Sequence, residues 1–271
     1  MILMGRIEKA FARTKNPAFI GFTVAGDPDK LTCIRIARSL IAGGTDILEL
    51  GVPFSDPVAD GPTIQKADER ALMAQTTPDT VFEIVREIRK ESDVPIVFLT
   101  YYNIVYRRGI ARFYREAHDA GVDGILIADM PVEESEEICT VASRCGIDPV
   151  FLIAQTTSDK RIKKIVAKAR GYVYLVSVLG VTGVRDQVSD GAIDLLNLVR
   201  RYTSLPLAIG FGISTPAQAQ TCARAGADGV IVGSAIVEIV ERNLKDPDAM
   251  ERELKEYVSS MKNALIGDHP V

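Results

Sequence analysis

Ala120-Gly121-Val122-Asp123-Gly124-Ile125 is the stretch that decides the fold, because the chain repeats it with small changes. Residues with helical spacing precede its first glycine, and a short apolar run follows it. Glycine just past a helix supplies the left-handed backbone at which many helices end, and a continuous apolar run is typical of a buried parallel strand. Similar phrases are Ala42-Gly43-Gly44-Thr45-Asp46-Ile47, Cys145-Gly146-Ile147-Asp148-Pro149-Val150 and Ala225-Gly226-Ala227-Asp228-Gly229-Val230. Each copy predicts a helix that ends just before a buried strand.

Apolar runs of this kind occur eight times, and helical patterns such as 112–120 and 160–169 separate them. The predicted strands are 18–24, 46–52, 96–101, 124–128, 150–154, 172–178, 205–211 and 229–232. Strict alternation, without a flexible linker or a break in composition, favours a closed barrel over a doubly wound open sheet. We expect an α/β fold, a single (β/α)8 TIM-barrel domain over residues 1–271, with an extra N-terminal helix at 3–14 that caps the barrel floor.

Composition and charge exclude several classes of protein. The chain is 47% hydrophobic and 25% charged, with a formal net charge of -4, which gives no basic field for nucleic acid or an anionic membrane. Its four cysteines form no C-x-x-C pair and it has only two histidines, so we expect neither a disulfide scaffold nor a metal site. No apolar run approaches the ~18 residues of a membrane span, and no signal peptide is evident. We expect a cytoplasmic protein.

One acid interrupts the second predicted strand. Glu49 lies in the apolar run Asp46-Ile47-Leu48-Glu49-Leu50-Gly51-Val52, and Asp60 follows in a turn-rich loop. A buried carboxylate is costly unless it is paired or used, although an edge strand could instead turn Glu49 toward water. Because TIM barrels place their chemistry at the C-terminal ends of the strands, we predict that Glu49 points inward with a raised pKa while Asp60 stays ionised. The alternative for Asp60 is a cap on a helix that begins at Pro62.

Glycine turns in the last three loops give a second signal. They are Gly180-Val181-Thr182-Gly183, Gly210-Phe211-Gly212-Ile213-Ser214 and Gly233-Ser234-Ala235. Backbone N–H groups at a helix N-terminus bind anions, and TIM barrels often hold a phosphate between the loops after strands seven and eight. Each turn alone is weak, since strand-to-helix turns need glycine for steric reasons. Together they predict a phosphate site, and 177–190 is expected to be a mobile lid or, alternatively, a surface loop without a role.

The sequence at 48–65, LELGVPFSDPVADGPTIQ, resembles the signature of the tryptophan synthase alpha chain family. Further similar motifs are Ala25-Gly26-Asp27-Pro28, Thr100-Tyr101-Tyr102-Asn103, Asp129-Met130-Pro131-Val132-Glu133-Glu134-Ser135, Gly180-Val181-Thr182-Gly183 and Gly210-Phe211-Gly212-Ile213. The resemblance covers about residues 6 to 262. Three positions depart from the family pattern: Val24 stands where threonine is usual, Ile104 replaces proline, and Leu179 replaces a smaller or more polar residue.

This resemblance implies an alpha subunit of tryptophan synthase, a carbon–carbon lyase of tryptophan biosynthesis. It would cleave indole-3-glycerol phosphate to indole and glyceraldehyde 3-phosphate by a retro-aldol step. The family needs no cofactor in this chain and passes indole to a beta subunit that uses pyridoxal phosphate, in an alpha2-beta2 complex.

The resemblance also assigns roles to residues. Glu49 would shuttle protons at the indole C3 and the glycerol hydroxyl, and Asp60 would hold the indole N–H and stabilise the indolenine cation. The implied substrate-binding residues are Phe22, Leu99, Tyr101, Tyr174, Thr182, Gly183, Phe211, Gly212, Gly233 and Ser234. Ala128, Leu152 and Ile231 are further candidates for the apolar part, although ordinary barrel core explains Leu152 and Ile231 better.

Two other functions stay open, because a fold with a phosphate pocket does not fix the chemistry. One is an isomerase acting on a related indole or sugar phosphate, and the other is a non-catalytic regulatory subunit. Loops 53–60, 103–109 and 177–190 are the surfaces expected to face a beta subunit. The basic groups Arg107-Arg108 and 160–164 indicate either an acidic partner or nucleic acid, or simply solvated helix faces.

Overall fold

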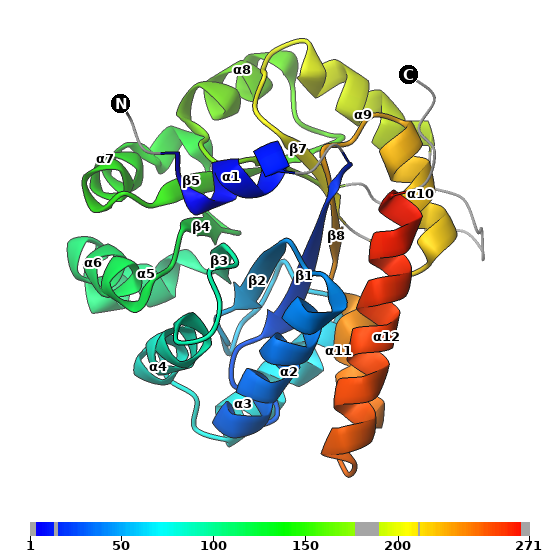
Figure 1. Ribbon diagram of the computed structural model, residues 1–271. Coiled ribbons are helices and arrows are strands. Elements are labelled where there is room, and N and C mark those ends of the chain that lie inside the picture. The colour runs from blue at the N-terminus through cyan, green and yellow to red at the C-terminus, as the bar shows by residue number, and fades with distance from the viewer. Residues whose placement is uncertain (1–3, 14–15, 177–189, 211, 267–271) are drawn as a thin grey trace.

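The computed structural model describes residues 4–13, 16–176, 190–210 and 212–266, and its strands close into a barrel. All eight strands are parallel and are hydrogen-bonded in chain order, with β8 pairing back to β1 (Figure 1). They are β1 Ala18–Val24, β2 Ile47–Gly51, β3 Ile96–Thr100, β4 Gly124–Ile127, β5 Asp148–Ala154, β6 Val173–Val176, β7 Leu207–Gly210 and β8 Gly229–Val232. The predicted TIM barrel is confirmed.

Helices surround the barrel in the described part of the chain (Figure 1). They are α1 Arg6–Arg13, α2 Lys30–Gly43, α3 Pro62–Met73, α4 Pro78–Arg89, α5 Tyr102–Arg108, α6 Ile110–Ala120, α7 Glu136–Cys145, α8 Asp159–Lys168, α9 Asp190–Arg200, α10 Pro216–Arg224, α11 Ser234–Arg242 and α12 Pro247–Leu265, with a short 3-10 turn at Val132–Glu134. The helices expected at 112–120 and 160–169 are α6 and α8. The expected strand start at residue 205 is wrong, because β7 begins at Leu207, after Pro206.

The glycines of the repeated phrase end helices as predicted. Gly44, Gly121 and Gly146 lie directly after α2, α6 and α7 with φ values of 110°, 103° and 68°. A side chain is strained in this left-handed region, whereas glycine enters it freely. The glycine of each phrase therefore turns the chain from the end of a helix toward the next strand.

Three of the four aspartates of the phrase bind neighbouring strands together at the barrel floor. Asp46, Asp123 and Asp228 accept hydrogen bonds from the backbone N–H groups of Phe19, Ile96 and Leu207, at 2.7, 2.8 and 2.8 Å. Each carboxylate also forms an ion pair, with Lys262, Arg89 and Arg200 respectively. The repeat in the sequence thus reflects a repeated contact between consecutive strands.

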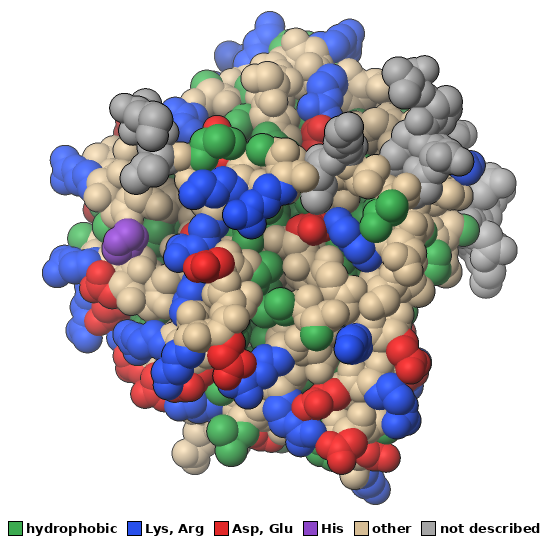
Figure 2. All heavy atoms as spheres, viewed as in Figure 1, with side chains coloured by type: hydrophobic (Ala, Val, Ile, Leu, Met, Phe, Trp, Pro, Cys, Tyr) green, Lys and Arg blue, Asp and Glu red, His purple; other side chains and the backbone are tan. Residues whose placement is uncertain are grey.

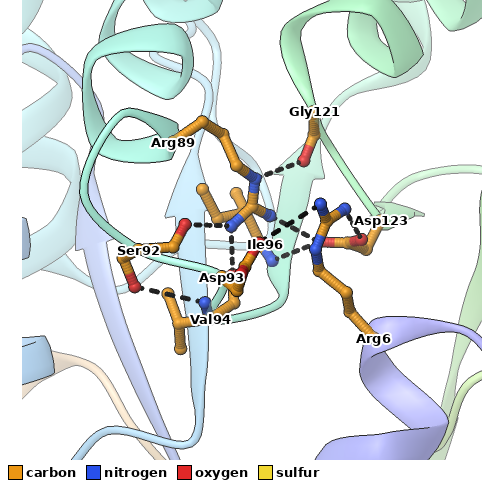
Figure 3. Close-up of polar contacts among 8 residues, drawn as sticks. All are labelled: Arg6, Arg89, Ser92, Asp93, Val94, Ile96, Gly121 and Asp123. Carbon is orange, nitrogen blue, oxygen red and sulfur yellow. Dashed lines mark hydrogen bonds and ion pairs between the residues drawn. The ribbon is translucent and has the colours of Figure 1, made fainter.

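Helix α1 lies across the barrel floor, as expected for the N-terminal cap (Figure 1). Ile7 is fully buried in the cluster that fills the barrel interior. Arg6 and Arg89 converge on Asp123, at 3.1 and 2.6 Å, and Arg89 also donates to the carbonyl of Gly121 (Figure 3). Both carboxylate oxygens of Asp123 therefore accept hydrogen bonds, and the contact with Arg6 fixes α1 to the floor.

Replacing Asp123 by Ala is expected to lower the free energy of unfolding by about 3–5 kcal/mol, because it leaves the mostly buried Arg89 guanidinium without its partner. Urea unfolding followed by circular dichroism measures this change. Asp93→Ala is the matched control, since Asp93 is 93% exposed and pairs with the same Arg6 at 3.5 Å, so about 1 kcal/mol or less is expected. Equal losses of unfolding free energy in the two variants would contradict a stabilising role for the contacts of Asp123 with Arg6 and Arg89.

The face that carries α1 is charged, with lysine and arginine side chains interspersed with acidic ones (Figure 2). A depression of about 850 Å³ on this face is lined by Arg6, Lys9, Asp93 and Asp123, among others, and contains none of the predicted site residues.

None of the helices in the described ranges is both long and apolar enough to cross a membrane. Within those same ranges, no group of three metal-ligating side chains occurs.

Candidate active site

A cavity of about 450 Å³ lies at the C-terminal ends of the strands, away from α1. Residues from β1, β2, β3, β6 and β8, from the loops after β2, β7 and β8, and from the helices α3 and α11 form its wall. They are Phe22, Glu49, Asp60, Gly61, Ile64, Leu99, Tyr174, Gly212, Ile213, Ser214, Ile231, Gly233, Ser234, Ala235 and Glu238. The two predicted catalytic acids therefore share one cavity with the glycine turns of the last two loops.

Glu49 points into the barrel because of its place in the strand alternation. Ile47 belongs to the interior cluster, whereas Leu48 and Leu50 pack between the strands and the helices. The closed barrel has no edge strand, so the solvent-facing alternative for Glu49 is excluded. Its side chain is fully buried.

Burial raises the pKa of Glu49 from its ordinary 4.5 to about 8. The Tyr172 hydroxyl donates a hydrogen bond to Oε1 at 3.1 Å, which opposes the rise, and the charge of Asp60 adds to it. Oε2 has no hydrogen-bond partner among the described residues. At neutral pH the carboxyl group is therefore mostly protonated and has one free oxygen, as an acid that must give a proton to a ligand requires.

Asp60 is held by an aromatic pair rather than by the helix that follows it. The Tyr101 hydroxyl donates to Asp60 Oδ2 at 2.6 Å and accepts from the Ala59 N–H at 3.1 Å. The ring of Tyr101 stacks on Phe54, with ring centroids 5.0 Å apart. Gly61 occupies the N-cap position of α3 without any side-chain cap, so the helix-cap alternative for Asp60 is wrong.

The Asp60 side chain is partly buried, although Val58 and Ala59 beside it are exposed. Burial raises the pKa of this carboxyl, and the hydrogen bond from Tyr101 opposes the rise. One tyrosine hydroxyl therefore favours the ionised form that the sequence analysis predicts.

The opposite wall of the cavity is mostly backbone. α11 begins at Ser234, and its N-cap residue Gly233 provides no side-chain cap. A Cβ atom at Gly233 would lie 3.1 Å from the ring of Phe22. Gly212, on the same wall, has a φ of 76°. Uncapped N–H groups at a helix start carry partial positive charge, so this end of the cavity suits an anion.

Comparison with known proteins agrees with this geometry. The family model described as tryptophan synthase alpha chain matches residues 9–266. The chain is 70% identical over 262 residues to the tryptophan synthase alpha chain of Methanoregula boonei, covering 97% of this chain and 99% of that one. The chain belongs to the tryptophan synthase alpha chain family. It is therefore a lyase of tryptophan biosynthesis, and the family's reaction is the cleavage of indole-3-glycerol phosphate.

Solved structures show the same alpha-chain fold. One is from work on the tryptophan synthase a2b2 complex of Pyrococcus furiosus, with a TM-score of 0.86 and 41% identity over 92% of this chain and 99% of that one. Another is the tryptophan synthase alpha chain of Legionella pneumophila, with a TM-score of 0.90 and 32% identity over 99% and 100% of the two chains. Because the chain belongs to the alpha chain family, the two alternative functions, an isomerase and a non-catalytic subunit, are not supported.

The structure brings together most of the residues predicted for the alpha-chain site. Phe22, Leu99, Tyr174, Gly212, Gly233 and Ser234 lie on the cavity wall, as does Ile231. Ala128 and Leu152 pack against the interior cluster instead, which favours barrel core for both. Tyr101 lies behind Asp60 rather than on the wall. Thr182, Gly183, Phe211 and the departure Leu179 lie outside the described residues, as does the expected lid except for Asp190, where α9 begins.

Tyr174 faces a glycine. A Cβ atom built on Gly210, at the end of β7, would lie 2.4 Å from the Tyr174 hydroxyl oxygen. Any larger residue at 210 would therefore have to displace this tyrosine from the alpha-chain cavity. The hydroxyl that reaches Glu49 belongs to Tyr172, two residues earlier on the same inward face of the chain.

Sequence reasoning missed several residues on or near the cavity wall. Ile64 and Glu238 lie on the wall although they belong to helices, whereas Ser214 belongs to a glycine turn that the sequence analysis included. Asp68 is only 4% exposed on α3, and burial raises its pKa to about 8, with the charge of Asp60 adding to the rise. Period-2 alternation from Tyr174 was the one signal that could have found Tyr172.

The departures and basic groups have structural explanations where they are described. Val24 is fully buried at the end of β1, and Ile104 packs against the core. Within the basic run at 160–164, Ile162 is fully buried. Arg161 and Lys164 both pair with Glu133, which favours the solvated helix face over a nucleic-acid surface.

Removing the Tyr172 hydroxyl is expected to shift the pH dependence of kcat/KM for indole release. The hydrogen bond from Tyr172 lowers the pKa of Glu49, so Tyr172→Phe raises that pKa further. If Glu49 is the general acid, it works while it is protonated, so activity should decline near pH 8 in the parent chain and at higher pH in the variant. Steady-state rates from pH 6 to 10 measure the shift; a decline that moves to lower pH contradicts the assigned contact.

Proposed function

We propose that Glu49 and Asp60 together catalyse the retro-aldol cleavage of indole-3-glycerol phosphate in this chain. The observation that carries the proposal is a buried, neutral acid and a second, tyrosine-held carboxylate on the wall of one cavity. Environments this different let two carboxyl groups perform different tasks at one pH.

Glu49 is the proton shuttle in this proposal. The protonated carboxyl donates its proton to C3 of the indole ring. The ring thereby becomes an indolenine cation, with the positive charge on its nitrogen. The carboxylate then removes the proton of the adjacent glycerol hydroxyl, and the bond between C3 and the glycerol carbon breaks. Its electron pair returns to the ring to give indole, the glycerol carbon becomes the aldehyde of glyceraldehyde 3-phosphate, and Glu49 is protonated again.

Asp60 stabilises the charge that this proton transfer creates. An ionised carboxylate that accepts the indole N–H favours the cation more than the neutral ring, and this difference lowers the barrier. Tyr101 acts through Asp60 as a positioning residue, since its hydroxyl fixes Oδ2 at 2.6 Å. Glu49 is buried and Asp60 is partly buried, which strengthens the electrostatic effect.

The remaining wall residues would hold the two ends of the substrate. Phe22, Leu99, Tyr174 and Ile231 offer apolar surface to the indole ring, and Phe211 is a further candidate. Gly212, Gly233 and Ser234 would bind the phosphate with backbone N–H groups and one hydroxyl, with Thr182 and Gly183 as further candidates. The start of α11 supplies favourable partial charge for the phosphate.

Incubation of the purified chain with indole-3-glycerol phosphate tests the proposal. Indole should appear together with an equal amount of glyceraldehyde 3-phosphate, and inorganic phosphate should inhibit competitively. Addition of a beta chain should raise the rate. Absence of indole in both conditions would overturn the proposed function.

The mechanism consists of proton transfers by protein side chains, so it requires no cofactor in this chain. Pyridoxal phosphate is expected only in the partner beta subunit.

A cytoplasmic location is also part of the proposal, and the four free cysteines, two of them buried, are consistent with a reducing compartment.

We further propose that the cavity end of the barrel binds a beta subunit in an alpha2-beta2 complex and passes indole to it. The related Pyrococcus furiosus structure comes from work on an a2b2 complex. Two loops expected to face the partner expose apolar side chains: Val58 is 83% exposed after β2, and Tyr106 is 63% exposed in α5. Exposed aromatic residues of this kind often anchor interfaces.

Replacing Tyr106 by Ser is expected to weaken binding of the beta subunit by about tenfold or more, because aromatic anchors contribute much of an interface's affinity. Titration of the beta chain, followed through the rise in indole release, measures the affinity, and the activity of the isolated chain should not change. Leu244→Ser is the control, since Leu244 is 38% exposed beyond the far end of α11. Equal affinities for the two variants would remove Tyr106 from the interface.

A further inference from the structure

Glu238 places a carboxylate on the cavity wall close to the predicted phosphate site. It lies on α11, four residues after Ser234, and both side chains line the cavity. Residues four apart on a helix lie on the same face with their Cβ atoms ~5–6 Å apart. The side chain of Glu238 is exposed, and it places a carboxylate on this wall.

The charge of Glu238 is not neutralised by an ion pair within the described part of the chain. The Thr63 hydroxyl donates a hydrogen bond to its Oε1 at 3.4 Å. Glu241, one turn further along α11, instead pairs with Lys66 and Arg70. Of these two acids on one helix, the acid on the cavity wall is the one without an ion pair among the described residues.

We propose that Glu238 is a binding-site residue that lowers the affinity of the cavity for phosphate and so favours release of the phosphorylated product. The inference rests on the proposed function, because it requires the phosphate to lie at Gly233 and Ser234. A carboxylate near a phosphate dianion repels it, whereas the start of α11 attracts it. The balance leaves the site able to bind phosphate without holding it tightly.

Repulsion of this kind acts equally on the substrate and on the product. Both carry the same phosphate, and the transition state carries it too. A contact that is equal in the ground state and the transition state changes KM and leaves the chemical step unchanged. The effect should also weaken as salt screens the exposed charge.

A structural role is the competing explanation, since Glu238 also joins α11 to α3 through Thr63. Two substitutions separate the explanations. Glu238→Gln removes the charge and keeps an oxygen that can accept the hydrogen bond. Thr63→Val removes the hydrogen bond and keeps the charge.

The experiment measures the dissociation constants of inorganic phosphate and glyceraldehyde 3-phosphate by calorimetry, and KM and kcat for indole release. In Glu238→Gln, both dissociation constants and KM should fall, on the order of three- to tenfold at low salt, and the difference should shrink at high salt. Thr63→Val should leave these constants unchanged. Glu241→Gln, an equal change of charge on the same helix away from the wall, should also leave them unchanged.

The inference is overturned if phosphate binds Glu238→Gln no more tightly than the parent chain, or if Thr63→Val or Glu241→Gln produces the same gain. Failure of the proposed function would appear differently, as an absence of indole release from the parent chain. The calorimetric comparison needs no turnover, so the two failures are distinguishable.

Discussion

Replacing Glu49 by Gln is expected to lower kcat for indole release by about 10²- to 10⁴-fold, the usual contribution of a general acid–base group. The amide keeps the shape of the side chain and can still accept from Tyr172, but it has no proton to give to the indole C3. KM should change little, because the phosphate and most of the ring contacts remain. Steady-state indole release at pH 7, alone and with the beta chain, measures the loss.

The same variant provides its own check on folding. The folded pKa of Glu49, about 8, lies above the ordinary 4.5, so the native state holds a proton that the unfolded state has lost between these values. The stability that this proton provides is complete below pH 4.5 and disappears as the pH rises through 8. Glu49→Gln should therefore unfold at a higher temperature than the parent at pH 8, with a smaller difference at pH 5. Activity that survives in a stable variant would contradict the shuttle.

Replacing Asp60 by Asn is expected to lower kcat by about 10²- to 10³-fold, as removal of one preorganised electrostatic group does in other enzymes. The amide can accept the indole N–H but carries no charge, so it binds the neutral ring while losing most of its advantage for the cation. kcat should therefore fall much more than KM rises. Indole release over a range of substrate concentrations separates the two constants.

Two further variants place this result in context. Tyr101→Phe removes the 2.6 Å hydrogen bond to Asp60 and should reduce kcat less than Asp60→Asn does. Glu69→Gln removes an exposed charge from α3 and should change neither constant. If Asp60→Asn raised KM and left kcat intact, Asp60 would be a binding residue rather than a stabiliser of charge.

The barrel could be predicted from the sequence because its signals are local and repeated. Gly121 and its counterparts end helices wherever they occur, and the aspartates beside them tie neighbouring strands at the floor. The position of Glu49 followed from the closed topology, since a barrel without an edge leaves an acid at an inward position no route to solvent. A pattern of this kind depends on neighbouring residues along the chain.

The surroundings of the site depend on contacts between distant segments, which the sequence does not show. Asp60 lies in a turn-rich loop, yet Tyr101, whose ring stacks on Phe54, donates a hydrogen bond to it from 41 positions away. Tyr172, which is 123 positions from Glu49 in the sequence, donates its hydrogen bond to Glu49 inside the barrel. In the sequence, Glu238 has the pattern of an ordinary exposed helix residue, and only the structure shows that it lines the cavity. Local periodicity cannot distinguish a charge that faces a cavity from one that faces bulk solvent.

The protonation state of Glu49 tests the central claim most directly. The carboxyl carbon of Glu49 can be followed by NMR in protein labelled with ¹³C at the glutamate side-chain carboxyl, and its signal is assigned by its absence from Glu49→Gln. A titration of the free chain should show this carboxyl ionising at about pH 8. A midpoint near the ordinary 4.5 would mean that Glu49 is already charged at neutral pH, and it could not be the acid that protonates indole.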